Sequence, residues 1–188
     1  MIKSKQELKD YLIADRLACG KQVDRGFKQK VAERLFPDYN YEYVKTLRKL
    51  EFAVNNGKKA YFLWRRLYKL RCKTGIEIQP NCIGAGLHVP HGKCVVSSQA
   101  KIGCNCKILS DVTIGGQGRY DKPGAATIGD RVFIGTGAKI IGAITIANDC
   151  VIGANAVVTK SFNEPGITIG GNPAVKISNN NSYHYLNK

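Results

Sequence analysis

Aliphatic residues recur every six positions through the second half of this 188-residue chain. The unbroken run is Ile128, Ile134, Ile140, Ile146, Ile152 and Val158, and two shorter runs in other registers precede it, Ile83, Val89, Val95 and Ile102, Ile108, Ile114. A period of six does not match the 3.6-residue turn of an α-helix, and an isolated amphipathic strand alternates by two. The spacing therefore predicts a coil with flat sides, each side being one short strand plus a turn.

Three such sides form a triangular parallel β-helix, a prism with the aliphatic side chains pointing inward. Stacked coils would then bury a continuous column of Ile and Val, and stability would accumulate coil by coil. We place this mainly β domain at residues 76–176 and interpret 177–188 as a polar tail with His184 flexible at the surface. The small residues that often follow the aliphatic ones suit the corners: Gly84, Gly103, Gly115, Gly129, Gly135 and Gly153.

The first 75 residues have a different composition and predict a basic α-helical segment. They contain 19 Lys and Arg against eight Asp and Glu, and so carry most of the chain's net charge of +15. Periodicity predicts helices around 5–20, 27–36 and 41–55, interrupted near Gly20, Pro37 and Gly57. The charge alone would suggest nucleic acid or an anionic membrane, but no nucleic-acid motif accompanies it, so we expect no nucleic-acid partner.

A further helix is predicted between Lys58 and Thr74, a stretch without Gly or Pro. Two interpretations of its basic face remain open. In the first the charges are solvated and the helix caps the prism. In the second residues 58–73 rest on anionic lipid as a peripheral membrane contact. The face expected to pack on the rest of the protein is Ala60, Tyr61, Trp64, Leu67, Tyr68 and Arg71.

Composition indicates the class of protein, the cellular compartment and the absence of a metal site. Hydrophobic residues make up 44% and charged residues 23% of the chain, values typical of soluble globular proteins. The N-terminus has no apolar signal core, and an odd number of cysteines, seven, favours reduced thiols. We therefore expect a cytoplasmic protein, with the inner face of the membrane as the alternative setting. The pair Cys104 and Cys106 lacks a second pair at zinc spacing, and we therefore expect no metal.

Three motifs within residues 74–176 resemble the hexapeptide-repeat acyltransferases, in particular serine O-acetyltransferase and its polysaccharide-cluster relatives. They are Thr-Gly-Ile-Glu-Ile-Gln-Pro at 74–80, Pro-His-Gly at 90–92 and Val-Thr-Ile-Gly-Gly-Gln-Gly at 112–118. The resemblance implies a left-handed prism, acetyl-CoA as co-substrate, and a homotrimer with coenzyme A between two prisms. The Tyr- and Lys/Arg-rich run into Thr74 is more similar to the capsule- and exopolysaccharide-associated members.

Acetyl transfer from a thioester to a hydroxyl needs a base for the hydroxyl proton. His91 matches the family's catalytic histidine, whereas His88, at a corner, is expected to face solvent. A histidine is a better base when a carboxylate fixes its tautomer and stabilises the imidazolium. Glu77 occupies the place where serine acetyltransferases carry an aspartate for that purpose, with a side chain one methylene longer.

Two departures from the serine acetyltransferase pattern affect the expected acceptor. Pro90 replaces an aspartate before the catalytic histidine, and Gly124 and Ala125 replace an arginine and a histidine at the loop exit. A site without these charged partners should bind a zwitterion poorly. We therefore expect a neutral hydroxyl acceptor, such as a sugar of a surface polysaccharide pathway. The alternatives are L-serine and, from another class, a non-catalytic trimeric scaffold that binds acidic partners or lipid.

The same resemblance implies where coenzyme A binds. Thr159 and Lys160 resemble the motif whose lysine meets the coenzyme phosphates, and Thr136 and Ala154 match small corner residues along the donor groove. Gly116 and Gly118 would allow close approach of the pantetheine arm. They begin the loop at 115–127, which interrupts the repeat and in this family reaches over the neighbouring subunit's site; it includes Arg119, Tyr120, Asp121, Lys122 and Pro123.

Overall fold

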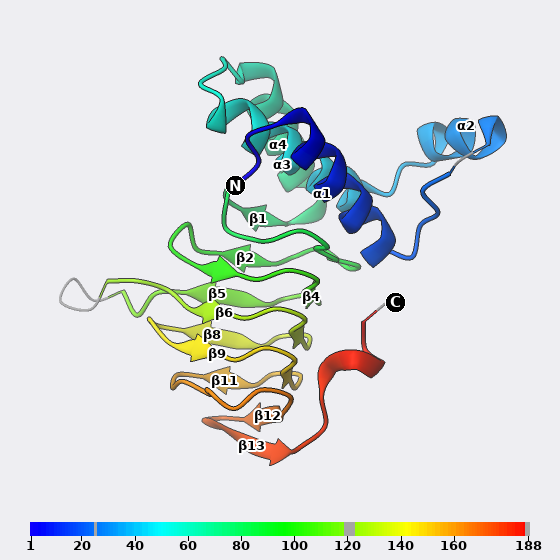
Figure 1. Cartoon of the computed structure of the whole chain (residues 1–188). Coiled ribbons are helices and arrows are strands. Elements are labelled where there is room, and N and C mark those ends of the chain that lie inside the picture. Colours follow the sequence, from blue (N-terminus) through cyan, green and yellow to red (C-terminus); the bar gives the residue numbers. More distant parts are fainter. Residues whose placement is uncertain (25, 119–122, 187–188) are drawn as a thin grey trace.

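The computed structural model describes residues 1–24, 26–118 and 123–186, in which four helices precede a stack of short strands (Figure 1). The helices are α1 (Lys5–Ala18), α2 (Phe27–Leu35), α3 (Tyr39–Asn55) and α4 (Tyr61–Thr74). The strands are β1 (Glu77–Ile78), β2 (Val95–Val96), β3 (Lys101–Ile102), β4 (Lys107–Ile108), β5 (Thr113–Gly115), β6 (Thr127–Ile128), β7 (Phe133–Ile134), β8 (Lys139–Ile141), β9 (Thr145–Ile146), β10 (Val151–Ile152), β11 (Val157–Val158), β12 (Thr168–Gly171) and β13 (Ala174–Ser178).

The strands form three sheets that are the sides of one prism (Figure 1). Their strand orders are β1-β2-β5-β8-β11, β13-β12-β10-β7-β4 and β3-β6-β9, and we call them the β1–β11, β4–β13 and β3–β9 sheets. Pairing is parallel except between β12 and β13. Successive hexads therefore fall on successive sides, and the predicted triangular parallel β-helix is confirmed.

The core of the prism is the predicted aliphatic column with one correction: Val95 is 45% exposed, and its neighbour Val96 is buried in its place. In the β1–β11 sheet Ile114, Ile140 and Val158 are aligned strand to strand and fully buried, and Ile134 and Ile152 occupy the same place in the β4–β13 sheet. Burying each such side chain contributes about 1.5–3 kcal/mol. Corners follow every strand, and several require a positive φ, which Asn and Asp tolerate best among non-glycine residues. These positions are Asn81, Lys93, Asn105, Asp111, Arg131, Asp149 and Asn155.

α3 lies across the top coil, which has no further coil above it to pair with (Figure 1). The Tyr43 hydroxyl donates to the carbonyl of Ile78 at 3.1 Å and accepts from its amide at 2.9 Å. About two turns further along α3, Glu51 accepts from the Asn81 amide at 2.8 Å. Side chains of α3 thus satisfy backbone groups that the next coil would otherwise satisfy.

Arg48 joins α3, α1 and the top coil through a fully buried guanidinium. It donates to the carbonyls of Ile83 (2.8 Å) and Gly84 (2.6 Å), and it pairs with Asp15 (2.8 Å) and Glu51 (3.0 Å). A buried charge is tolerated only when partners on all sides compensate its desolvation. The arrangement fixes the helical segment on the prism as one packed unit.

α4 packs through a stripe that differs from most of the predicted face, although Leu67 and the preceding Ala60 pack as predicted. Leu67 and Leu70 are buried, whereas Tyr61 and Tyr68 are 70% and 66% exposed. The spacing of Leu67, Leu70 and Thr74 sets the contact stripe, and the two tyrosines lie more than a quarter-turn away from it. Aromatic residues at 61, 62, 64 and 68 lie on more than one side of the helix, so the sequence did not mark which stripe would pack.

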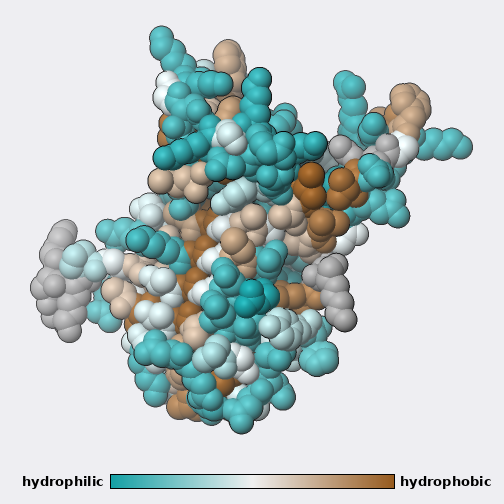
Figure 2. All heavy atoms as spheres, in the orientation of Figure 1, coloured by the Kyte–Doolittle hydropathy of each residue, from teal (hydrophilic) through white to brown (hydrophobic). Residues whose placement is uncertain are grey.

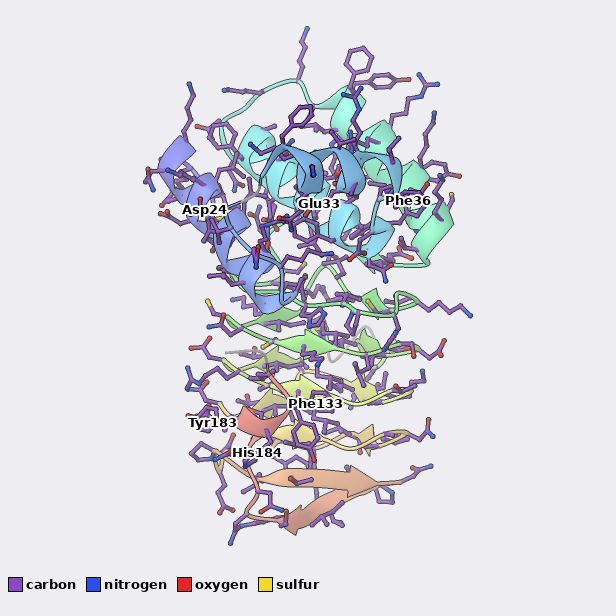
Figure 3. The ribbon with its side chains drawn as sticks, turned by 90° about the vertical axis from the view of Figure 1, so that its right-hand side faces the viewer. Asp24, Glu33, Phe36, Phe133, Tyr183 and His184 are labelled. Carbon is purple, nitrogen blue, oxygen red and sulfur yellow. The ribbon has the colours of Figure 1, made fainter. Side chains whose placement is uncertain are left out.

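The C-terminal tail is held against the prism rather than free (Figure 3). β13 runs to Ser178, two residues past the predicted boundary at 176, and His184 ends a 3₁₀ turn, Ser182–His184. Ser182 is fully buried and its amide donates to Asp149 at 3.0 Å. The Tyr185 ring packs on Phe133 with centroids 4.6 Å apart.

α2 projects from the rest of the helical segment (Figures 1 and 3). None of its residues is buried, and an ion pair of 2.6 Å between Arg16 and Glu33 ties it to α1. Hydrophilic side chains cover most of the helical segment in Figure 2. No helix in the described part of the chain is both long enough and apolar enough to cross a membrane.

Candidate active site

His91 lies on the corner of the top coil that leads into β2, and its side chain is exposed. Both neighbours in the chain are held. The Pro90 carbonyl accepts from Asn40 Nδ2 at 2.9 Å, and Gly92 has a φ of +69° with the Thr74 carbonyl oxygen only 2.4 Å from where a Cβ would stand. The imidazole therefore stands on a tightly packed turn.

Glu77 opens β1 in the top coil, beside Val95 of β2. Its amide donates to the Cys94 carbonyl at 2.8 Å, and its carboxylate forms an ion pair with the guanidinium of Arg71 from α4. Among the described residues no hydrogen bond joins Glu77 to His91. The pairing of the two as base and orienting carboxylate therefore stays a prediction, and Arg71 is a partner that sequence reasoning missed.

His88 is half-buried on the β4–β13 sheet, where it forms a bridge with Lys107, and is not the solvent-facing corner residue we expected. Burial, and then the nearby Lys107 ammonium, lower the pKa of His88 to about 4. Its Nδ1 is buried without a partner among the described residues. It borders a cavity of 440 Å³ beneath α1, whose lining also includes Leu17 and Leu186.

The small residues predicted for the donor groove follow His91 down one corner of the prism. Thr136 and Ala154 stand three residues before β8 and β11, and His91 stands four residues before β2, next to the matching position. Corner hydrogen bonds align these coils, because the amide of Asn155 donates to Thr136 at 2.8 Å. Space there is limited: a Cβ on Gly135 would stand 2.7 Å from the Ala154 amide nitrogen. This corner presents a narrow column of small residues beneath the histidine.

The remaining predicted donor residues lie on the opposite edge of the same sheet. Gly116 and Gly118 follow β5, and Thr159 and Lys160 follow β11. Since the strands of the β1–β11 sheet are parallel, residues that precede its strands lie along one edge and residues that follow them lie along the other. One chain by itself therefore does not bring His91 and Lys160 together.

Gly124 and Ala125 form the loop exit, where the resemblance implies two charged residues. Gly124 has a φ of +120°, a Cβ on it would stand 3.1 Å from the Ala143 Cβ, and Ala125 is buried. The predicted loop residues Arg119, Tyr120, Asp121 and Lys122 lie outside the described residues.

Cys106, of the pair for which the sequence predicts no metal, is buried in the prism. Burial raises the pKa of Cys106 to about 12, which keeps it a thiol at neutral pH. Within residues 1–24, 26–118 and 123–186, no three His, Cys, Asp or Glu side chains gather closely enough to hold a metal ion.

Comparison with known proteins gives consistent matches. Residues 125–160 match the family model "Bacterial transferase hexapeptide (six repeats)". A serine acetyltransferase of Helicobacter pylori strain 26695 is 41% identical over 116 residues, covering 60% of this chain and 68% of that protein. A serine acetyltransferase of Mycobacterium tuberculosis is 38% identical over 129 residues, covering 63% of this chain and 56% of that protein.

Solved structures give the same result for the fold. Serine acetyltransferase from Brucella abortus strain S19 superposes with a TM-score of 0.76 at 26% identity, covering 95% of this chain and 72% of that one. Serine acetyltransferase from Neisseria gonorrhoeae superposes with a TM-score of 0.73 at 30% identity, covering 93% of this chain and 66% of that one. The predicted left-handed β-helix is thereby confirmed.

Proposed function

Because this chain belongs to the serine acetyltransferase family of hexapeptide-repeat acyltransferases, we propose that it moves the acetyl group of acetyl-CoA to the hydroxyl of L-serine. The observation that carries the proposal is the single prism corner on which His91 stands above Thr136 and Ala154. The expected similarity to the polysaccharide-associated branch was wrong, since the relatives compared above are serine acetyltransferases. Membership of an enzyme family also argues against the non-catalytic scaffold.

In the proposed reaction His91 takes the proton of the acceptor hydroxyl. The hydroxyl oxygen then bonds to the thioester carbonyl carbon, and the carbon–sulfur bond breaks. The sulfur leaves with the bonding electron pair, and the His91 imidazolium returns the proton to it. A positioned base of this kind contributes about 10²–10⁴-fold to the rate. Glu77 would steady the imidazolium, in competition with Arg71 for the same carboxylate.

Coenzyme A would lie between two copies of the chain in a homotrimer. The support is the split of the predicted donor residues between opposite edges of the β1–β11 sheet. A site made from the His91 edge of one prism and the Lys160 edge of the next would contain both sets.

A neutral hydroxyl, such as a sugar, is the second candidate acceptor. Pro90, Gly124 and Ala125 stand where this resemblance leads us to expect charged partners for the amino acid. Losing such partners lowers the affinity for a zwitterion strongly. The relatives favour serine, and these three residues favour the neutral acceptor.

One experiment tests the reaction and separates the two acceptors. Thiol release from acetyl-CoA is measured with L-serine and with a panel of sugars and nucleotide sugars, and the acetylated product is identified. His91→Gln should lower kcat about 10²–10⁴-fold, whereas His184→Gln, on the tail, should leave it unchanged. Acetyl transfer that survives in His91→Gln would overturn the assignment of the base, and product with sugars alone would replace serine as the acceptor.

The outer face of α4 supports one further part of the proposal, a peripheral contact with anionic lipid. Phe62 is 80% exposed and Trp64 44% exposed, and no acidic residue lies between Gly57 and Gly75. Arg66 and Arg71 are already paired with Glu42 and Glu77. Lys73 lies over the Tyr39 ring, so the cations left for lipid are Lys58, Lys59, Arg65 and Lys69, interleaved with aromatic rings as in interfacial helices.

A further inference from the structure

The turn that carries His91 is held from the helical segment by one side chain, Asn40, in the first turn of α3. Asn40 and His91 are 51 positions apart in the chain. We infer that Asn40 is a positioning residue that fixes the direction of the His91 imidazole. This inference rests on the proposed role of His91 as the base.

Asn40 reaches both residues that flank His91. Its Nδ2 donates to the Pro90 carbonyl at 2.9 Å, and its Oδ1 stands 3.2 Å from the place where a Cβ of Gly92 would be. On the other side the Thr74 carbonyl closes the space over Gly92 and also accepts from the Lys93 amide at 2.8 Å. The backbone before and after His91 is therefore confined from two directions.

The backbone of Asn40 is itself fixed. Asp38 caps α3 by accepting from the Tyr41 amide at 3.1 Å, and the fully buried Tyr43 is bonded to both backbone groups of Ile78. Asn40 is two residues from the cap and less than one turn from Tyr43, so its backbone has little freedom. Such support matters because a displacement of about 1 Å at a catalytic group can cost about 10²-fold in rate.

The chemistry of the contact requires an amide. The Pro90 carbonyl is an acceptor, so the side chain at position 40 must donate. Aspartate has the same shape but presents a carboxylate oxygen to that carbonyl, which replaces attraction with repulsion. Alanine removes the contact altogether. Both changes should let the turn relax while the rest of α3 remains docked through Tyr43 and Arg48.

The test compares Asn40→Asp and Asn40→Ala with the same substitutions at Asn55. Asn55 lies on the same helix and donates to the Ile2 carbonyl at 3.0 Å and to Asn81, on the corner after β1. We expect the Asn40 variants to lower kcat about 10–100-fold with the KM for acetyl-CoA changed less than twofold. The Asn55 variants should keep kcat. Asn40→Ser, which retains a donor, should recover part of the loss.

A second readout does not depend on knowing the acceptor. The chain has three histidines, so the ring cross-peak of His91 is assigned by NMR from His88→Gln and His184→Gln. We expect that cross-peak to shift or broaden in both Asn40 variants and to stay in place in both Asn55 variants. An unchanged cross-peak in a folded Asn40→Asp protein, or an equal fall in kcat in the Asn55 variants, would overturn the inference. If no acceptor is turned over, the proposed function fails while the cross-peak still decides the role of Asn40.

Discussion

At the scale of single residues, the site depends on how closely the backbone passes itself around His91. Gly92 combines a φ of +69° with a carbonyl oxygen 2.4 Å from its missing Cβ. Gly57 has nearly the same φ, +64°, but no atom within 4 Å of that place. The two glycines therefore separate the cost of the left-handed conformation from the cost of the close approach.

Gly57→Ala should lower the free energy of unfolding by the conformational cost alone, roughly 1–2 kcal/mol. Gly92→Ala should cost more than Gly57→Ala, because the Thr74 carbonyl must also move, and it should lower kcat by shifting His91. Denaturant unfolding at matched protein concentration and kcat measurements check both. Equal losses of stability with full activity in Gly92→Ala would show that the close approach is not needed.

At the scale of elements, the period of six was enough to predict the strands, because the aliphatic residue of each hexad marks the position that is buried. Docking of the helices had no such signal. Arg48, Tyr43 and Asn40 contact backbone groups 35 to 50 positions away, and nothing in the pattern of α3 marks those contacts. For the same reason the Arg71 partner of Glu77 and the burial of His88 appear only in the folded chain.

α4 carries the element-scale prediction about lipid. Co-sedimentation with vesicles containing anionic lipid should be strong at low salt and weaken as salt rises. Arg65→Gln combined with Lys69→Gln removes two cations from the outer face, each worth about 1 kcal/mol near an anionic surface, so partitioning should fall about 30-fold.

The matched control for that experiment is Lys28→Gln with Lys30→Gln on α2, which removes the same charge elsewhere. If the two double variants lose vesicle binding equally, the effect comes from the net charge of the protein and not from the outer face of α4. An absence of binding by the unaltered protein at low salt would contradict the lipid contact.

At the scale of the whole molecule, the proposed homotrimer makes each site depend on two copies. His91→Gln and Lys160→Glu chains, each weak alone, should complement one another when co-expressed. With random mixing, about a quarter of the sites would combine an intact His91 edge with an intact Lys160 edge. Activity near a quarter of the unaltered protein supports the shared site, whereas activity no higher than that of either variant alone contradicts it.

Both ends of the prism are finished by something other than another coil. At the top, backbone groups of the first coil are hydrogen-bonded by Tyr43, Arg48 and Glu51. At the bottom of the β4–β13 sheet, the antiparallel strand β13 turns back. A parallel stack with bare ends would be a template on which a second chain could continue the winding, and then a third. Closing the two ends keeps this repeat from growing into a filament.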